Sequence, residues 1–149
     1  MQTIIEYKQI KQGSASYYLA VALRLNILLD PLGLTLSPKD LATEKTSLHF
    51  VALLNQQVVG TVLLTPEENG KTTSFQLRQM AVSSDMQSHG VGSNLLGFVE
   101  RSLKDYQDCY VWCNAQLTAQ RFYEKNGFQI VGEPFTLEGL PHIKMQKTL

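Results

Sequence analysis

A short glycine-containing segment constrains the fold of this chain more than any other feature of its sequence. Residues 87–92, QSHGVG, follow an apolar, strand-like run at residues 75–82 and lead into a helix-like run at residues 91–103. A glycine turn between a strand and a helix gathers free backbone N–H groups at the positive end of the helix dipole. The segment therefore predicts a binding site for a phosphate or pyrophosphate, with a purely structural turn as the alternative.

The N-terminal third is predicted to form a strand, a helix and an irregular segment. Residues 3–7 have the pattern of a strand, and residues 14–29 carry dense apolar positions separated by good helix formers. An Asp-Pro pair at residues 30–31 is predicted to end this helix. Residues 32–47 are expected to form an irregular excursion with a short turn of helix.

Three strands joined by short loops are predicted next. Residues 49–54 and 58–64 form the first two, with a hairpin-sized loop at residues 55–57 between them. A turn at residues 66–70 is expected to lead to the third strand at residues 73–82. Loops this short indicate an antiparallel meander.

The third of these strands contains an irregularity in its side-chain alternation. Phe75 and Leu77 share one parity, whereas Met80 and Val82 share the other. One residue inserted near Arg78, a β-bulge, would shift the inward-facing set in this way. The alternative is that Met80 and Val82 face a second packed layer.

The segment that follows the glycine turn predicts a parallel crossover. Residues 91–103 carry one apolar stripe at helical spacing. Residues 109–113 are apolar on both faces, as expected of a central strand that is covered on both sides. Strand, helix and strand in this order form a parallel unit.

The C-terminal residues are predicted to form a helix and a hairpin. The helix covers residues 117–126 and ends at Gly127, a plausible left-handed C-cap. Residues 128–133 and 143–146 are expected to pair as the final hairpin, around a turn at residues 138–142.

The composition predicts one globular domain, residues 1–149, with 44% hydrophobic and 17% charged residues. Thirteen basic and thirteen acidic side chains cancel, which argues against nucleic acid as a partner because counterion release needs a concentrated basic face. Neither a signal peptide nor a membrane span is recognisable, so we expect a cytoplasmic protein without a membrane partner. Cys109 and Cys113 are expected to be buried reduced thiols rather than metal ligands.

Two common phosphate-binding motifs do not fit the glycine turn. A Walker-type loop ends in Gly-Lys-Ser/Thr, whereas this turn continues as Gly92-Ser93-Asn94. A dinucleotide-binding fold would place its glycines at the first strand–helix turn of an alternating chain. Here the turn follows an antiparallel meander.

The remaining motif evidence is a resemblance to a known superfamily. The pattern Gln-x-x-Gly-x-Gly at residues 87–92 resembles the pyrophosphate-binding motif of the GNAT N-acetyltransferases, which use acetyl-CoA. Residues 119–128, AQRFYEKNGF, resemble the helix-to-strand segment that is usually readable as FYxKxGF in that superfamily. The tail, at residues 131–133 and 139–142, is similar to one subgroup of small bacterial members. The resemblance is good over residues 58–145 and loose before residue 48, where the superfamily builds its acceptor site.

The resemblance implies an α+β fold of three layers. A mixed, mostly antiparallel central sheet of six to seven strands would be flanked by helices, with one parallel crossover at the CoA site. Acetyl-CoA would be the cosubstrate, without a metal. Contacts to it are implied for the bulged strand, the glycine turn and the end of the following strand: Met80, Val82, Gln87, Ser88, His89, Gly90, Val91, Gly92 and Asn114.

Two of the implied site residues have alternative interpretations. Tyr123 occupies the position of the superfamily tyrosine that protonates the departing CoA thiolate, and its alternative is a core tyrosine beside Phe122. A phenol is a weaker acid than a thiol, so this transfer is uphill unless the site favours it. Asn114 would bond the pantetheine arm or a water, or would cap the helix that follows.

The general base is not specified by the resemblance. Many members place a glutamate on the bulged strand, where this chain has Gln76, Arg78 and Gln79. Ordered water, His142, His49 or Glu44 could then accept the proton, with a structural turn histidine as the alternative for His142. Arg78 and Gln79 suggest a polar or carboxylate-bearing acceptor, unless Arg78 is simply an exposed strand residue.

The function predicted on this basis is transfer of the acetyl group of acetyl-CoA to a primary amine by direct attack. The alternatives are a non-catalytic acyl-CoA-binding or regulatory module, and an interaction protein whose glycine turn binds nothing. The sequence does not identify the acceptor amine. Dimerisation is common for such folds, so a homodimer is a further expectation, although no segment specifies it.

Overall fold

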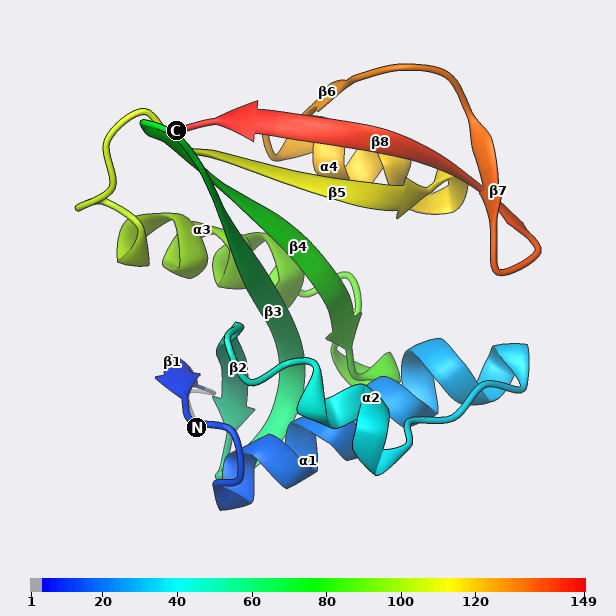
Figure 1. The fold of residues 1–149 in the computed structure, drawn as a ribbon. Coiled ribbons are helices and arrows are strands. Elements are labelled where there is room, and N and C mark those ends of the chain that lie inside the picture. The colour runs from blue at the N-terminus through cyan, green and yellow to red at the C-terminus, as the bar shows by residue number, and fades with distance from the viewer. Residues whose placement is uncertain (1–3) are drawn as a thin grey trace.

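Eight strands form one mixed sheet in the computed structural model, which describes residues 4–149 (Figure 1). The strands follow the order β1-β2-β3-β4-β5-β8-β6, and β7 also pairs with β8. Every pairing is antiparallel except that of β4 with β5. The predicted α+β class and its single parallel crossover are confirmed. The strand number exceeds the expected six to seven because residues 135–137 form an additional short strand, β7.

The N-terminal region begins with a strand and a helix that changes type along its length. The elements are β1 (Ile5–Ile10), α1 (Ala15–Arg24), a π-helical turn η1 (Leu25–Leu29), a 3₁₀ turn η2 (Asp30–Leu32) and α2 (Pro38–Ala42). Ser14 caps α1 by accepting a hydrogen bond from the backbone of Tyr17. The predicted strand exists but extends to Ile10, because its backbone pairs with β2 as far as His49. Thr3, the first residue of that prediction, lies outside the described residues.

The predicted meander is present, with one correction. It consists of β2 (Leu48–Leu54), β3 (Gln57–Asn69) and β4 (Thr72–Val82). The predicted turn at residues 66–70 is wrong, because Pro66 lies within β3 and faces Phe75 across the ladder. Its missing N–H costs little there, since β2 pairs with β3 only up to Leu64 and leaves that edge of β3 open.

The crossover consists of η3 (Ser84–Met86), α3 (Val91–Ser102) and β5 (Tyr110–Gln116). It is followed by η4 (Leu117–Ala119), α4 (Gln120–Lys125), β6 (Gln129–Ile130), β7 (Phe135–Leu137) and β8 (Leu140–Thr148). Gly127 ends α4 with φ 92°, as predicted for a left-handed C-cap.

The predicted pairing of residues 128–133 with residues 143–146 is confirmed in part, because β6 pairs antiparallel with Met145 and Gln146 of β8. The tight hairpin at this end of the chain is a different one. β7 and β8 are its strands, and the turn contains only Glu138 and Gly139, both with positive φ (53° and 74°). A two-residue turn of this kind suits the twist of a hairpin, so β8 begins earlier than the sequence suggested. His142 consequently lies in a strand and not in the turn.

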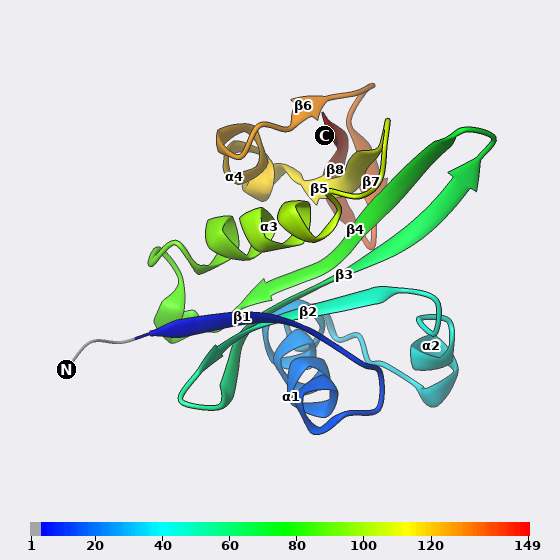
Figure 2. The ribbon, with the colours of Figure 1, turned by 90° about the vertical axis from the view of Figure 1, so that its left-hand side faces the viewer.

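The helices cover both faces of the sheet (Figure 2). α3 lies on one face of β1–β4, and α1 lies on the opposite face. Between α3, α4 and the sheet lies the main core, which includes Phe50, Phe75, Leu95 and Met145. This layering leaves the ends of β4 and β5 between α1 and α4.

Candidate active site

The glycine turn presents free backbone donors at the start of α3. Gly90 is the N-cap residue, with φ 78°, and no side chain caps the helix. Within residues 4–149, the N–H groups of Gly90, Val91 and Gly92 donate to no protein acceptor. Three unpaired donors at the positive end of a helix dipole provide a favourable site for an anion.

Side chains of the turn hold its backbone in shape. The Gln87 side chain donates from Nε2 to the carbonyl of Val82 at 3.0 Å, which ties the turn to the end of β4. The exposed His89 ring bonds through Nδ1 to the carbonyl of Gln87 at 2.9 Å. The backbone N–H of His89 donates to the carbonyl of Met86 at 3.3 Å and is therefore already paired within the chain. Ser88 adopts φ 68°, a left-handed conformation that helps to form the turn.

Gly92 is required by packing against an aromatic ring. A Cβ atom at this position would lie 3.0 Å from Cζ and 3.1 Å from Cε1 of Phe122. The glycine therefore allows α4 to approach the first turn of α3. The side-chain amide of Asn126 reinforces this contact by donating to Ser93 Oγ at 3.2 Å and to the carbonyl of Phe122 at 2.8 Å.

A cavity of about 360 Å³ extends from the glycine turn along the end of β4. Its walls come from η1, β4, the turn, α3, η4 and α4, and they are mostly apolar. The lining residues are Ile27, Met80, Ala81, Val82, Met86, Gln87, Ser88, Val91, Gly92, Ala119 and Phe122. We call this space the donor cavity, because acetyl-CoA, the acetyl donor that the sequence resemblance implies, would lie here.

The predicted bulge in β4 is present. The register between β3 and β4 shifts between Thr61 and Leu63, and Gln79 adopts φ 58°. Gln79 and Met80 have no register partner in β3. β4 pairs with β5 only from Ser74 to Gln76, so the two parallel strands separate beyond that point. As a result, backbone groups of β4 around Met80 face the opening rather than a neighbouring strand.

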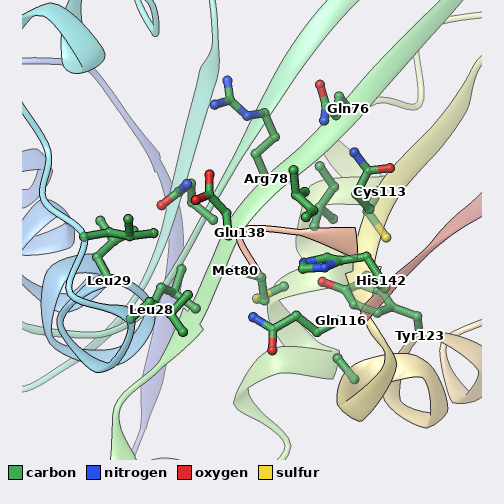
Figure 3. A pocket seen from close by; sticks show the side chains of 18 residues that line it. Leu28, Leu29, Gln76, Arg78, Met80, Cys113, Gln116, Tyr123, Glu138 and His142 are labelled. Carbon is green, nitrogen blue, oxygen red and sulfur yellow. The ribbon is translucent and has the colours of Figure 1, made fainter. Parts of the chain in front are cut away.

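A second cavity, of about 530 Å³, adjoins the first. Figure 3 shows the side chains that line it. Met80 and Ala119 line both spaces, so the two cavities meet at the bulge. The larger one is lined by residues of η1, β4, β5, α4, the β7–β8 turn and β8, and we call it the acceptor cavity. Of the predicted site residues, it contains Met80, Asn114 and Tyr123.

Tyr123 projects into the acceptor cavity from α4 (Figure 3). The residue is 7% exposed, and its hydroxyl makes no hydrogen bond to any residue that the structure describes. Burial raises the pKa of this phenol above its ordinary value, with the nearby Cys113 as a smaller cause. Tyr123 is therefore a neutral phenol with an unpaired proton facing the cavity.

Cys113 lies in the same cavity, at the centre of β5. It is 2% exposed, and burial raises the pKa of its thiol to about 12. Cys109 is also a buried free thiol, as predicted. Because the thiolate is the nucleophilic form of cysteine, Cys113 is inert at neutral pH.

Asn114 lies within β5, opposite Lys144 of β8. The helix-capping alternative is excluded, because the N-cap positions of η4 and α4 are held by Gln116 and Ala119 and not by Asn114. The strand extends three residues beyond the predicted end at Cys113. Asn114 consequently faces the acceptor cavity.

Two of the candidate bases are occupied elsewhere in the structure. The Glu44 carboxylate receives hydrogen bonds from both terminal nitrogens of Arg24, at 3.0 and 2.6 Å. His49 bonds through Nε2 to the carbonyl of Glu44 at 3.2 Å, and burial lowers its pKa. Neither residue lines either cavity. His142 does line the acceptor cavity.

Arg24 is a structural residue that the sequence interpretation missed. It lies on α1, is 2% exposed, and donates from Nε to the side-chain oxygen of Gln79 at 3.3 Å. Arg24 therefore connects α1 both to Glu44 and, through Gln79, to the bulge of β4. The signal in the sequence was one arginine inside an otherwise apolar helical run.

The wall of the acceptor cavity distant from Tyr123 combines charged and apolar side chains. Arg78 projects from β4, and Glu138 belongs to the β7–β8 turn. Leu28 and Leu29 of η1 line the side of the cavity opposite Tyr123 (Figure 3). Arg78 forms no salt bridge within residues 4–149. The cavity thus offers one unpaired cation to a ligand.

Comparisons with known proteins give the family and the fold of this chain. Residues 36–149 match the family model described as an acetyltransferase (GNAT) domain. The uncharacterized N-acetyltransferase YitI of Bacillus subtilis is 30% identical over 107 residues, which cover 69% of this chain and 72% of the relative. The crystal structure of Escherichia coli ElaA has a TM-score of 0.80 at 22% identity, covering 97% of this chain and 99% of the other. A GNAT family acetyltransferase from Elizabethkingia anophelis, solved with acetyl-CoA bound, has a TM-score of 0.66 at 22% identity, with coverage of 97% and 98%.

The chain therefore belongs to the GNAT acetyltransferase family, and the resemblance seen in the sequence is confirmed. It is an acyltransferase, and acetyl transfer from acetyl-CoA is the general reaction of its family. Among the described residues, no helix is long and apolar enough to cross a membrane. No cluster of three or more potential metal ligands occurs in the same part of the chain.

Proposed function

We propose that this protein transfers the acetyl group of acetyl-CoA to a primary amine by direct attack on the thioester carbonyl. The observation that carries the proposal is the meeting of two cavities at Met80, with an anion site at the far end of one and the Tyr123 hydroxyl in the other. A donor molecule with a phosphate end and a reactive thioester end fits this arrangement.

Acetyl-CoA would occupy the donor cavity. Its pyrophosphate would accept hydrogen bonds from the free amides at Gly90, Val91 and Gly92, and its pantetheine arm would lie along β4 toward Met80. Val82 lines this path, and Asn114 faces the region beyond it. The thioester would then lie where β4 and β5 separate.

The bulge would polarise the thioester carbonyl. Backbone groups of Gln79 and Met80 lack partners in β3, and β5 has already separated from β4 at this point. An N–H directed at the carbonyl oxygen would stabilise the negative charge that develops during attack, as an oxyanion hole does.

Tyr123 would protonate the departing CoA thiolate. In water a phenol, with a pKa near 10, is a weaker acid than a thiol, with a pKa near 8.5, so the transfer is uphill. Burial raises the pKa of the Cys113 thiol in the same space to about 12 and raises the pKa of the Tyr123 phenol too, so both groups are weaker acids there than in water. A CoA sulfur in this space would be desolvated in the same way, and its thiolate would become a stronger base.

Direct attack is favoured over a covalent acetyl-cysteine route. Of the residues that the structure describes, Cys113 is the one thiol that lines either cavity, and its raised pKa keeps it protonated at neutral pH. A protonated, 2% exposed thiol is a poor nucleophile. The absence of an activated thiol supports attack on the thioester by the acceptor amine itself.

The acceptor would carry a polar or anionic group in addition to its amine. Arg78 supplies an unpaired guanidinium to the acceptor cavity, and Gln76 and Gln116 line the same space. A guanidinium matches a carboxylate with two parallel hydrogen bonds. Amines that carry a carboxylate are thus the first acceptors to test.

Two measurements test the proposal. Acetyl-CoA at 100 times its Kd should stabilise the protein by about 2.7 kcal/mol in a thermal shift experiment. Release of CoA should then be followed with a panel of acceptors: glycine, lysine, tyramine, spermidine, an aminoglycoside and a short peptide with a free N-terminus. We expect turnover with at least one amine and formation of its N-acetyl product.

The variant Tyr123→Phe separates the acid role from the rest of the proposal. It should bind acetyl-CoA like the wild type and lose kcat, because it lacks only the hydroxyl group that supplies the proton. Tight binding of acetyl-CoA without acetylation of any amine would refute the proposed transfer and favour a non-catalytic acyl-CoA-binding module. Full activity of Tyr123→Phe would refute only the role of the tyrosine.

A further inference from the structure

Gln79 is a half-buried residue of β4 whose side-chain amide has a protein partner at one end only. It lies at the bulge, where it adopts φ 58° and has no register partner in β3. Its side-chain oxygen, Oε1, accepts a hydrogen bond of 3.3 Å from Nε of Arg24. Its nitrogen, Nε2, makes no hydrogen bond to any residue that the structure describes. The amide therefore carries two N–H donors that these residues leave free.

Arg24 determines which way the Gln79 amide faces. A guanidinium N–H only donates hydrogen bonds, so the amide atom that faces Arg24 must be the oxygen. Arg24 is itself held in place, since it is 2% exposed and both of its terminal nitrogens donate to the Glu44 carboxylate. Rotating the amide by 180° would bring two donors together and leave a buried N–H of Arg24 without an acceptor. The Nε2 donors of Gln79 are thus fixed on the side away from Arg24.

The bulge brings this amide to the cavity that holds the unpaired cation. Arg78 and Gln79 are consecutive residues, and both line the acceptor cavity. Consecutive residues of a regular strand face opposite sides of the sheet, and the positive φ of Gln79 breaks this alternation. Residues other than glycine rarely adopt such a φ, and backbone strain of this kind gathers at functional sites. The cavity thus receives a guanidinium and a primary amide from neighbouring positions of one strand.

We propose that Gln79 is a specificity residue that binds the carboxylate of the acceptor together with Arg78. The inference rests on the proposed function and gives its acceptor cavity a carboxylate subsite made of two residues. A carboxylate only accepts hydrogen bonds, and the guanidinium and the fixed N–H groups of Gln79 only donate them. A primary amide in the same place would bring an NH₂ group that finds no acceptor in this pair. The subsite therefore selects an amino acid over its amide.

The acidic side chain in the wall of the acceptor cavity does not cancel these donors. Of the residues that the structure describes, Glu138 is the one carboxylate that lines this cavity. It is exposed in the β7–β8 turn, so water screens its repulsion of an anionic ligand. It forms no salt bridge with Arg78. The donors of Arg78 and Gln79 remain available to a ligand.

Replacing the donor at position 79 with an acceptor tests the proposal. Gln79→Glu keeps an oxygen toward Arg24 and replaces the NH₂ group with a second oxygen, which repels a carboxylate. The readout is the ratio of kcat/KM for an acid to kcat/KM for its amide, with glycine against glycinamide and lysine against lysinamide. We expect this ratio to fall by about 10–100-fold relative to the wild type. Both members of a pair react with the same thioester, so a general change in the bulge cancels in the ratio.

Two further variants make the test independent of one substitution. Gln79→Gly removes the amide, and glycine suits the positive φ, so the bulge is kept even if the glutamate variant does not fold. It should lower the same ratio. Gln116→Glu is the matched control, because Gln116 is also half-buried and lines the acceptor cavity. Figure 3 shows Gln116 on the other side of Met80 from Arg78, so the added charge should change the ratio much less.

A binding measurement without turnover examines the same subsite. The side-chain amide signal of Gln79 in ¹H–¹⁵N spectra is identified by its absence in Gln79→Glu. Butyrate, a carboxylate without an amine, should shift this signal in the presence of CoA. Butyramide at the same concentration should shift it less.

The outcomes distinguish this proposal from the proposed function. An unchanged ratio in both variants of Gln79, an equal fall in Gln116→Glu, or a Gln79 signal that butyrate does not shift would each overturn the role of Gln79. In these cases the acetyl transfer would stand. A wild type that binds acetyl-CoA but acetylates none of the amines would refute the proposed function, and the butyrate titration would then decide the subsite on its own.

Discussion

Breaking the buried ion pair between Arg24 and Glu44 should destabilise the protein more than any other exchange of a single charged group. Both residues are 2% exposed, and two hydrogen bonds of 3.0 and 2.6 Å join the guanidinium to the carboxylate. The remaining guanidinium nitrogen of Arg24, Nε, donates to the side-chain oxygen of Gln79 at 3.3 Å. Glu44→Gln keeps the shape of the side chain but leaves the Arg24 charge without its counter-ion.

The expected cost follows from burial rather than from the attraction itself. Removing one partner of a buried pair leaves an uncompensated charge in a poorly solvated place and typically costs about 3–5 kcal/mol. This is a large fraction of the roughly 5–15 kcal/mol by which a domain is stable. Replacing both partners with apolar residues, as in Arg24→Met with Glu44→Leu, removes the unpaired charge. The double variant should thus be more stable than either single variant.

A second ion pair in the same chain provides the matched control. Lys147 and Glu100 are joined at 2.8 Å, but their side chains are 27% and 25% exposed. Glu100→Gln should cost less than about 1 kcal/mol, because water screens and solvates this pair.

Urea denaturation measures the free energy of unfolding for the whole set. The reasoning would be refuted if Glu44→Gln and Glu100→Gln had equal costs, or if the double variant were less stable than both single ones. Because Arg24 also holds Gln79 at the bulge, we expect Glu44→Gln to lower kcat at temperatures where the variant remains folded.

Three further predictions concern the cavities. Gly92→Ala should weaken acetyl-CoA binding, measured by calorimetry, because its Cβ would lie 3.0 Å from the Phe122 ring that lines the donor cavity. The folded-state pKa of Cys113 is raised from 9.0 to about 12, so stability due to its protonated thiol is present below pH 9 and lost as the pH rises toward 12. Cys113→Ala should therefore lose less stability than the wild type between these pH values in denaturant titrations, and equal losses would contradict the shift. Arg78→Gln should raise the KM of carboxylate-bearing amines about tenfold or more and leave that of uncharged amines nearly unchanged in steady-state assays, whereas equal effects on both classes would exclude Arg78 as the carboxylate partner.

Local signals in the sequence were sufficient for most of the fold. Ser14 begins α1, Gly127 ends α4, and the change of parity between Leu77 and Met80 marks the bulge. Each of these features depends on a few neighbouring residues. Pro66 was misread because its tolerance in β3 depends on where β2 ends, and no local pattern contains that information.

Long-range contacts explain what the sequence did not reveal about the site. His142 was expected in a turn, and it lies in β8 because the hairpin closes at Glu138 and Gly139. Glu44 was a candidate base until its pairing with Arg24, twenty residues away in the chain, became visible. The chemistry of both residues is determined by their partners, and the sequence alone does not identify those partners.

The two ends of the site also differ in how they are built. The proposed anion site uses backbone groups of one contiguous segment, so a short motif is enough to suggest it. The acceptor cavity uses side chains from η1, β4, β5, α4, the β7–β8 turn and β8, and no short motif covers them.

Adjacent residues of the π-helical turn η1 face both spaces, with Ile27 in the donor cavity and Leu28 in the acceptor cavity. Because η1 lines both cavities, a substitution that moves this turn would change the shape of both. Substitutions at Arg78 should alter acceptor choice alone, whereas those in η1 should alter acceptor choice and acetyl-CoA affinity together.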